Sequence, residues 1–169
     1  MPSIYHIVLL TTRHSISGEL TLTEQRLSDF LNDRRDTAFT LRKTQVARLN
    51  EPSKILQRHA ESVIPKAWVV AAFEPPQKEN SESNRLYGYV PKMRHEVFLI
   101  LEGMEVRGTL HTPGGLDLRR LLATTGDSFV PITQAVVRFF ENDRYVIEQN
   151  AIMVNTHLIR YIGTVESKS

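Results

Sequence analysis

Cysteine is absent from the 169 residues of this chain. This absence excludes disulfide bonds, thiolate-bound zinc and cysteine nucleophiles together. The six histidines show neither a His-x-His nor a His-Glu-x-x-His spacing, so the sequence predicts no metal site and no cofactor. A phosphate-binding loop is also missing, because Pro113-Gly114-Gly115 lacks the spacing and the lysine of that motif.

Long apolar runs are missing as well. The first part of the chain offers only Ile7 to Leu10, with no lysine or arginine before it. Such a run is too short for a secretory signal or a membrane span. We therefore expect a soluble, cytoplasmic protein without a membrane partner.

The chain has little excess of either charge, since its 21 Lys and Arg are nearly balanced by 19 Asp and Glu and the net charge is +2. The excess falls in residues 1–73, which carry ten basic and seven acidic side chains. Binding to a nucleic-acid backbone requires clustered cations. The candidate contacts for an anion or a nucleic acid are Arg34, Arg35, Arg42 and Lys43, and the alternative is an ordinary solvated surface.

Clustered carboxylates are the remaining candidates for chemistry. Asp29, Asp33 and Asp36 lie close together in the sequence, and paired carboxylates can serve as general acid and base. However, Arg120 aligns with Asp29 in the second half of the chain. We therefore predict no catalytic residues and a protein that is not an enzyme.

The chain does contain an internal similarity. Residues 95–110 predict a β-hairpin that turns at Glu102-Gly103, and a weaker form of the same pattern lies about ninety residues earlier. One inserted residue shifts the match at the first helix, after which the original offset is expected to return. The matched pairs are Ile7 with Val97, Gly18 with Gly108, Leu27 with Leu118, Phe39 with Phe129, Val46 with Val136, Ile64 with Val154 and Trp68 with Leu158.

Each half is predicted to run from a hairpin through a short helix to further strands. In the first half, Leu27, Phe30 and Leu31 have helical spacing, and Thr23 is the expected N-cap. Residues 63–73 predict one well-buried strand because the run is almost continuously apolar. The second helix is expected to end near Gly126.

The predicted fold class is mainly β with short helices, formed by a tandem duplication of a small β-barrel; the alternative is an α+β fold of β-grasp-like repeats. The repeats are expected at 1–74 and 91–169, joined by a polar linker at 75–90. Units of this size bury only about 60% of their unfolded surface. We therefore expect the halves to dock through a shared interface.

The strand of residues 97–101, the hairpin to Leu110, the strand 129–137 and the closing segment 152–162 resemble the strand order of Sm-like barrels within the SH3-like class. In that family an Asp and Asn pair after the second strand, and a later Arg-Gly, contact RNA. Here the first position is occupied by a predicted helix, and Asn155-Thr156 and Pro65-Lys66 replace the second. The resemblance therefore implies a fold but carries over no RNA-binding residues.

A second resemblance covers Gly18-Glu19-Leu20 and the following Arg26 to Asn32, Arg-Leu-Ser-Asp-Phe-Leu-Asn. These residues are similar to a short domain of uncharacterised bacterial proteins. That likeness implies no activity.

Three hypotheses follow for function. The preferred one is a non-catalytic interaction or assembly module whose edge strands serve self-assembly or a protein partner. The second is a weak nucleic-acid-binding protein of the Sm-like class that uses the basic residues of the first half. The third is a small-ligand or enzymatic site at the seam between the repeats.

Overall fold

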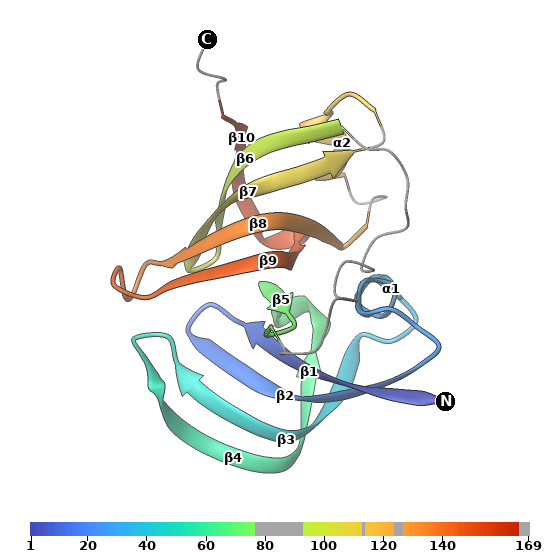
Figure 1. Ribbon diagram of the computed structural model, residues 1–169, viewed down its shortest axis with the longest axis vertical. Helices are drawn as coiled ribbons and strands as arrows, with labels where there is room; N and C mark the ends of the chain where they lie inside the picture. The colour runs from blue at the N-terminus through green and yellow to red at the C-terminus, as the bar shows by residue number, and fades with distance from the viewer. Residues whose placement is uncertain (77–92, 113, 124–126, 166–169) are drawn as a thin grey trace.

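The computed structural model describes residues 1–76, 93–112, 114–123 and 127–165 (Figure 1). The first half contains β1 (Pro2–Leu10), β2 (His14–Thr23), α1 (Leu27–Asn32), β3 (Ala38–Arg48), β4 (Glu51–Pro65), the 3-10 turn η1 (Lys66–Trp68) and β5 (Ala71–Phe73). The second half contains β6 (Met93–Leu101), β7 (Met104–Thr112), α2 (Leu118–Leu121), β8 (Phe129–Phe139), β9 (Val146–Asn155), the 3-10 turn η3 (Thr156–Leu158) and β10 (Ile159–Thr164).

The ten strands form one sheet in the order β10-β6-β7-β8-β9-β5-β1-β2-β3-β4. Every neighbouring pair is antiparallel. The helices have six and four residues, which is too short to form a layer beside the sheet. The predicted mainly β fold class is therefore confirmed, in preference to the α+β alternative.

Both halves have the same strand layout. In each, four strands follow one another across the sheet, and the fifth returns to pair with the first. The hairpin registers also agree, because Ile7 lies opposite Gly18 in β1–β2 and Val97 lies opposite Gly108 in β6–β7. The predicted duplication requires such a shared layout.

The predicted alignment of the third strands is wrong by one residue. Phe39 was expected over Phe129, and Val46 over Val136. The ladders show instead that the residue inserted before the second helix still shifts the following strand. Apolar residues fill both candidate positions, so the sequence pattern alone could not choose between them. The corrected pairs are Phe39 with Val130 and Val46 with Val137.

Two predictions about local structure in the first half are also wrong. Helix α1 begins at Leu27 after Arg26, which makes no side-chain cap hydrogen bond, so Thr23 is not the N-cap. Residues 63–73 do not form one strand, because the chain leaves β4 after Pro65 and turns through η1 before β5. Trp68 in that turn is 69% exposed. An apolar run therefore did not imply continuous burial.

The second helix was expected to end near Gly126, but α2 ends at Leu121, because Leu122 after it leaves the helical conformation with φ −90° and ψ 0°. The predicted linker at 75–90 lies mostly outside the described residues, since the structure describes only residues 75 and 76 of it.

The halves join where β5 of the first pairs with β9 of the second (Figure 1). Ala72 lies opposite Met153 in this ladder. Next to it, Asn155 donates its backbone N–H to the Val70 carbonyl over 3.0 Å, and its side-chain amide to the Val69 carbonyl over 2.9 Å. We call this β5–β9 contact, with the side chains packed around it, the inner joint.

Apolar side chains cross the inner joint in both directions. Each half has its own core, but each core contains residues of the other half, so the expected shared interface is present. Burial of this kind stabilises by about 25 cal/mol per Å² of apolar surface. Leu10, Leu49, Val70, Ala71 and Phe73 enter the core of the second half, and Phe129 and Met153 enter the core of the first.

Gly108 gives the first testable prediction. A Cβ at this position would lie 2.5 Å from Ile132 Cγ2 and 2.7 Å from the Thr133 carbonyl oxygen, so backbone would have to move. We expect Gly108→Ala to lower the free energy of unfolding by about 1–3 kcal/mol. Gly18→Ala should cost less, because its nearest contact is 3.0 Å.

Urea denaturation measures these differences. The control is Gly115→Ala, since nothing lies within 4 Å of a Cβ there. Equal stability of all three variants would contradict the close approach of β7 and β8 at Gly108.

Candidate functional site

The four predicted cations lie on two different elements. Arg34 and Arg35 are in the loop after α1, whereas Arg42 and Lys43 lie within β3. Each pair is therefore considered with its own neighbours.

Arg35 is paired with a carboxylate of its own loop. Its guanidinium donates to both oxygens of Asp33, with Nη2 2.7 Å from Oδ2 and Nε 2.9 Å from Oδ1, and its backbone N–H donates to Oδ1 over 3.0 Å. The hydrogen bond from the Arg35 side chain is the main cause that holds the pKa of Asp33 well below its usual range. An external anion would have to compete with this carboxylate for Arg35.

Lys43 is also balanced within the chain. Its Nζ lies 3.2 Å from Glu19 Oε1, and its backbone has a positive φ of 50°. The β2–β3 register shifts between Ser17 and Glu19, next to this pair. Lys43 is therefore already engaged with an acid from the neighbouring strand.

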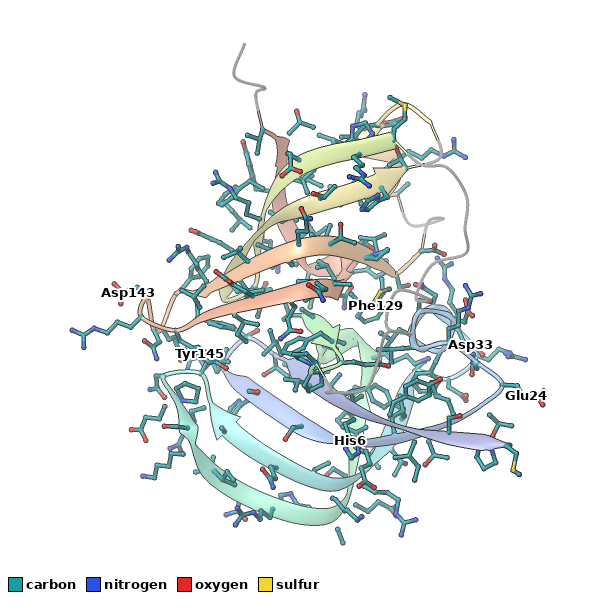
Figure 2. The ribbon with its side chains drawn as sticks, viewed as in Figure 1. His6, Glu24, Asp33, Phe129, Asp143 and Tyr145 are labelled. Carbon is teal, nitrogen blue, oxygen red and sulfur yellow. The ribbon has the colours of Figure 1, made fainter. Side chains whose placement is uncertain are left out.

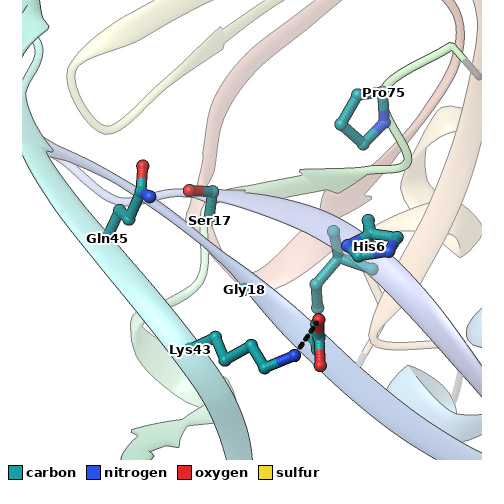
Figure 3. A pocket seen from close by; sticks show the side chains of 8 residues that line it. His6, Ser17, Gly18, Lys43, Gln45 and Pro75 are labelled. Carbon is teal, nitrogen blue, oxygen red and sulfur yellow. Dashed lines mark hydrogen bonds and ion pairs between the residues drawn. The ribbon is translucent and has the colours of Figure 1, made fainter. Parts of the chain in front are cut away.

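A small pocket lies beside this ion pair (Figure 3). It encloses about 190 Å³, which is less than the roughly 300–1,000 Å³ of typical ligand sites. None of its residues belongs to the second half, so it is not the seam site that the third hypothesis requires. The lining residues are His6, Ile7, Ser17, Gly18, Glu19, Lys43, Gln45 and Pro75.

Metal and membrane sites receive no support. Within the described ranges, no group of three or more His, Asp or Glu is placed to hold a metal ion. The helices in the part of the chain that the structure describes are also not long and apolar enough to cross a membrane.

Lys66 is a buried cation that the sequence analysis did not single out. Its Nζ donates to the carbonyls of Phe30 and Asp33 over 2.7 and 2.8 Å, and lies 4.5 Å from the centre of the Phe30 ring. These carbonyls belong to the end of α1, where helical partners are lacking. Burial lowers the pKa of Lys66. Its role is therefore structural: it holds α1 against the turn that follows β4.

Glu74 is a partly buried ionisable group that precedes Pro75 of the pocket lining. Burial raises the pKa of its carboxyl, and its Oε1 has no hydrogen-bond partner among the residues that the structure describes. A single carboxyl of this kind does not form a site.

The outer strands of the sheet, β4 and β10, are the remaining candidate site. Among the residues that the structure describes, β4 pairs only with β3, and β10 pairs only with β6, so each leaves a row of backbone groups without a sheet partner there. We call the outer sides of these two strands the free edges. Large apolar side chains are exposed on them: Val63 is 66% exposed on β4, and Tyr161 is 55% exposed on β10.

Comparisons with known proteins add nothing to this geometry. No family model, no curated protein sequence and no solved structure matches the chain. The Sm-like resemblance and the likeness to a bacterial domain therefore stay predictions, and function has to be argued from the molecule itself.

Lys66 gives the second prediction. Lys66→Met should lower the free energy of unfolding by about 1–3 kcal/mol, because the part-buried carbonyls of Phe30 and Asp33 each lose a charged donor. Lys43→Met should change it by less than about 1 kcal/mol, because exposed ion pairs contribute little. Thermal unfolding followed by circular dichroism compares the variants. Equal effects would show that the Lys66 contacts do not contribute to stability.

Proposed function

We propose that this chain is a non-catalytic interaction module built from two like β-barrel units, which binds protein by strand addition at its free edges. The observation that carries the proposal is the single sheet with a paired joint in its middle and an unpaired strand at each end. Unpaired strands present N–H and C=O groups that template pairing with another chain.

The free edge of β4 carries features that restrict pairing to one part of it. Pro52 and Lys54 lie near its start, and Pro65 ends it. Proline and lysine are common means of preventing uncontrolled association of edge strands. The residues between Lys54 and Pro65, which include Val63, carry neither proline nor lysine. This distribution supports specific pairing at one end of the strand.

We also propose that the two units arose by tandem duplication of a small Sm-like barrel. The equal strand layout of the halves supports this origin, as does the equal register of their hairpins. A cytoplasmic location is part of the proposal, and the absence of cysteine is consistent with it.

Nucleic-acid binding is the less favoured candidate. Arg35 and Lys43 are each paired with a carboxylate of the chain. Binding to phosphate would have to break or share those pairs. Two of the four candidate cations are therefore already neutralised, which counts against the open, unbalanced patch that counterion release requires.

The proposal predicts protein contacts at the free edges. A photo-crosslinking phenylalanine analogue in place of Val63 or Tyr161 should form protein adducts in the cells that make this protein. The same analogue at Arg107, which is exposed on the inner strand β7 and lies between Phe98 of β6 and Val136 of β8, is the matched control. Adducts are detected by mass on denaturing gels. If the edge positions give no more adduct than Arg107, the proposed function is wrong.

A further inference from the structure

We infer that the partner at the free edges is a second copy of this chain, with β10 of one molecule pairing antiparallel with β4 of the next. The register places Ile162 opposite Val63 and Tyr161 opposite Ile64. This inference rests on the proposed function and specifies its partner.

The first argument is that β10 occupies the place of β5 in its own half. Ala71 of β5 lies opposite Leu10 of β1. Ninety residues later, Tyr161 of β10 lies opposite Ile100 of β6. The two strands therefore have the same register against the first strand of their halves, but only β5 has a partner on its other side.

The strands β4 and β9 are equivalent in the same way. Val63 of β4 lies opposite Thr40 of β3, and Met153 of β9 lies opposite Pro131 of β8. The turns that follow agree too, since the N–H groups of Lys66 and Thr156 donate to matching carbonyls of the preceding loops. β9 has β5 on its outer side, whereas β4 has no strand there within the described part of the chain.

Exposure provides the second argument. Three apolar positions are buried at the inner joint, and the equivalent positions at the free ends are open. Leu49 and Phe140 are equivalent because they make the same hydrogen bond in their halves. The N–H of Leu49 donates to the Arg13 carbonyl, and the N–H of Phe140 donates to the Gly103 carbonyl. The exposed fractions are 2% for Met153 and 66% for Val63, 0% for Ala71 and 55% for Tyr161, and 1% for Leu49 and 55% for Phe140.

These three open side chains match the exchange across the inner joint. Met153 enters the core of the half that supplies β5, and Ala71 and Leu49 enter the core of the half that supplies β9. Pairing β10 with β4 of another molecule would bring Val63 into the core of the half that supplies β10. It would bring Tyr161 and Phe140 into the core of the half that supplies β4. One contact would thus cover three exposed apolar side chains.

The backbone of β4 is oriented for this contact. Asn155 donates its N–H to Val70, toward β5. Met153 lies two residues away, and alternate residues of a strand direct their backbone groups to the same side. By equivalence, Val63 directs its N–H and C=O away from β3. Ile162, the equivalent of Ala72, does the same on β10.

The contact between molecules should be weaker than the inner joint. Pro65 stands at the position of Asn155 and has neither a backbone N–H nor a side-chain amide. Ala123 stands at the position of Asn32, whose side chain accepts from the Phe129 N–H over 2.8 Å and donates to its carbonyl over 3.0 Å. Phe129 is labelled in Figure 2. Assembly should therefore depend on protein concentration.

The symmetry of the assembly follows from the two different surfaces. A contact between β10 of one copy and β4 of another is heterologous, so copies add head to tail and give either a closed ring or an open chain. A two-fold dimer through β4–β4 or β10–β10 contacts is not expected.

The first test measures mass by light scattering and native mass spectrometry over a range of concentrations. The wild-type chain should form assemblies whose mass increases in whole multiples of the monomer. Val63→Pro removes an outward N–H and crowds the arriving strand, so it should raise the dissociation constant at least about tenfold. A wild-type chain that stays monomeric at millimolar concentration overturns the inference.

The control is His59→Pro. His59 lies four residues before Val63 and directs its backbone outward too, but β10 does not reach it, because Thr164 would lie opposite Glu61. Circular dichroism checks that both variants fold. If His59→Pro weakens assembly as much as Val63→Pro, the contact is not at the expected register and the inference is wrong.

A second test reads the register directly and does not depend on proline. The chain lacks cysteine, so Ile64→Cys and Tyr161→Cys each introduce a single thiol. These residues would form a pair without ladder hydrogen bonds, at a Cα separation of about 4.5 Å that a disulfide can span. Oxidation of a mixture should give a covalent dimer of one copy of each variant.

The outcomes separate this inference from the proposed function. A disulfide dimer in the single-variant samples would indicate a two-fold contact and overturn the head-to-tail arrangement. Monomers that nevertheless form photo-adducts with another protein at Val63 would overturn the second copy as partner and leave strand addition standing. Absence of both would overturn the two together.

Discussion

The pairing of β5 with β9 is the contact on which the rest of the molecule depends. It makes one sheet out of two small units, and it aligns the apolar side chains that each unit places in the core of the other. Units of this size are marginally stable alone, because a small domain buries too little of its surface. The exchange across the joint supplies the missing burial, so the halves should stabilise each other rather than fold as independent domains.

The same contact explains why the ends of the sheet are unusual. In the arrangement that we propose, each unit gives one strand to a neighbour and receives one from another, so joining only two units leaves one strand of each kind unpaired. β10 and β4 are the end strands of the sheet. The proposal accounts for their exposed apolar side chains as contact positions, and for Pro65 as a residue that weakens the contact.

Much of the fold could be predicted from the sequence, because hairpins depend on local alternation and on glycine. The sequence matched Gly18 with Gly108 and Ile7 with Val97, and in the structure each glycine lies opposite the apolar residue of its own hairpin. What could not be predicted depends on contacts between distant segments. The role of Lys66 requires the end of α1 to lie beside it, and pattern analysis does not give such a position. Two of the candidate cations illustrate the same limit, since the sequence did not reveal that Asp33 would pair with Arg35 and Glu19 with Lys43. The sequence also suggested edge strands as contact surfaces, but it did not predict which residues form them.

The inner joint makes the two halves one cooperative unit, and calorimetry tests this most directly. Differential scanning calorimetry at a concentration where the chain is monomeric should give one unfolding transition, with equal calorimetric and van't Hoff enthalpies. Two separate transitions, one for residues 1–76 and one for residues 93–165, would contradict it, because the exchanged side chains would then contribute little to the stability of either half.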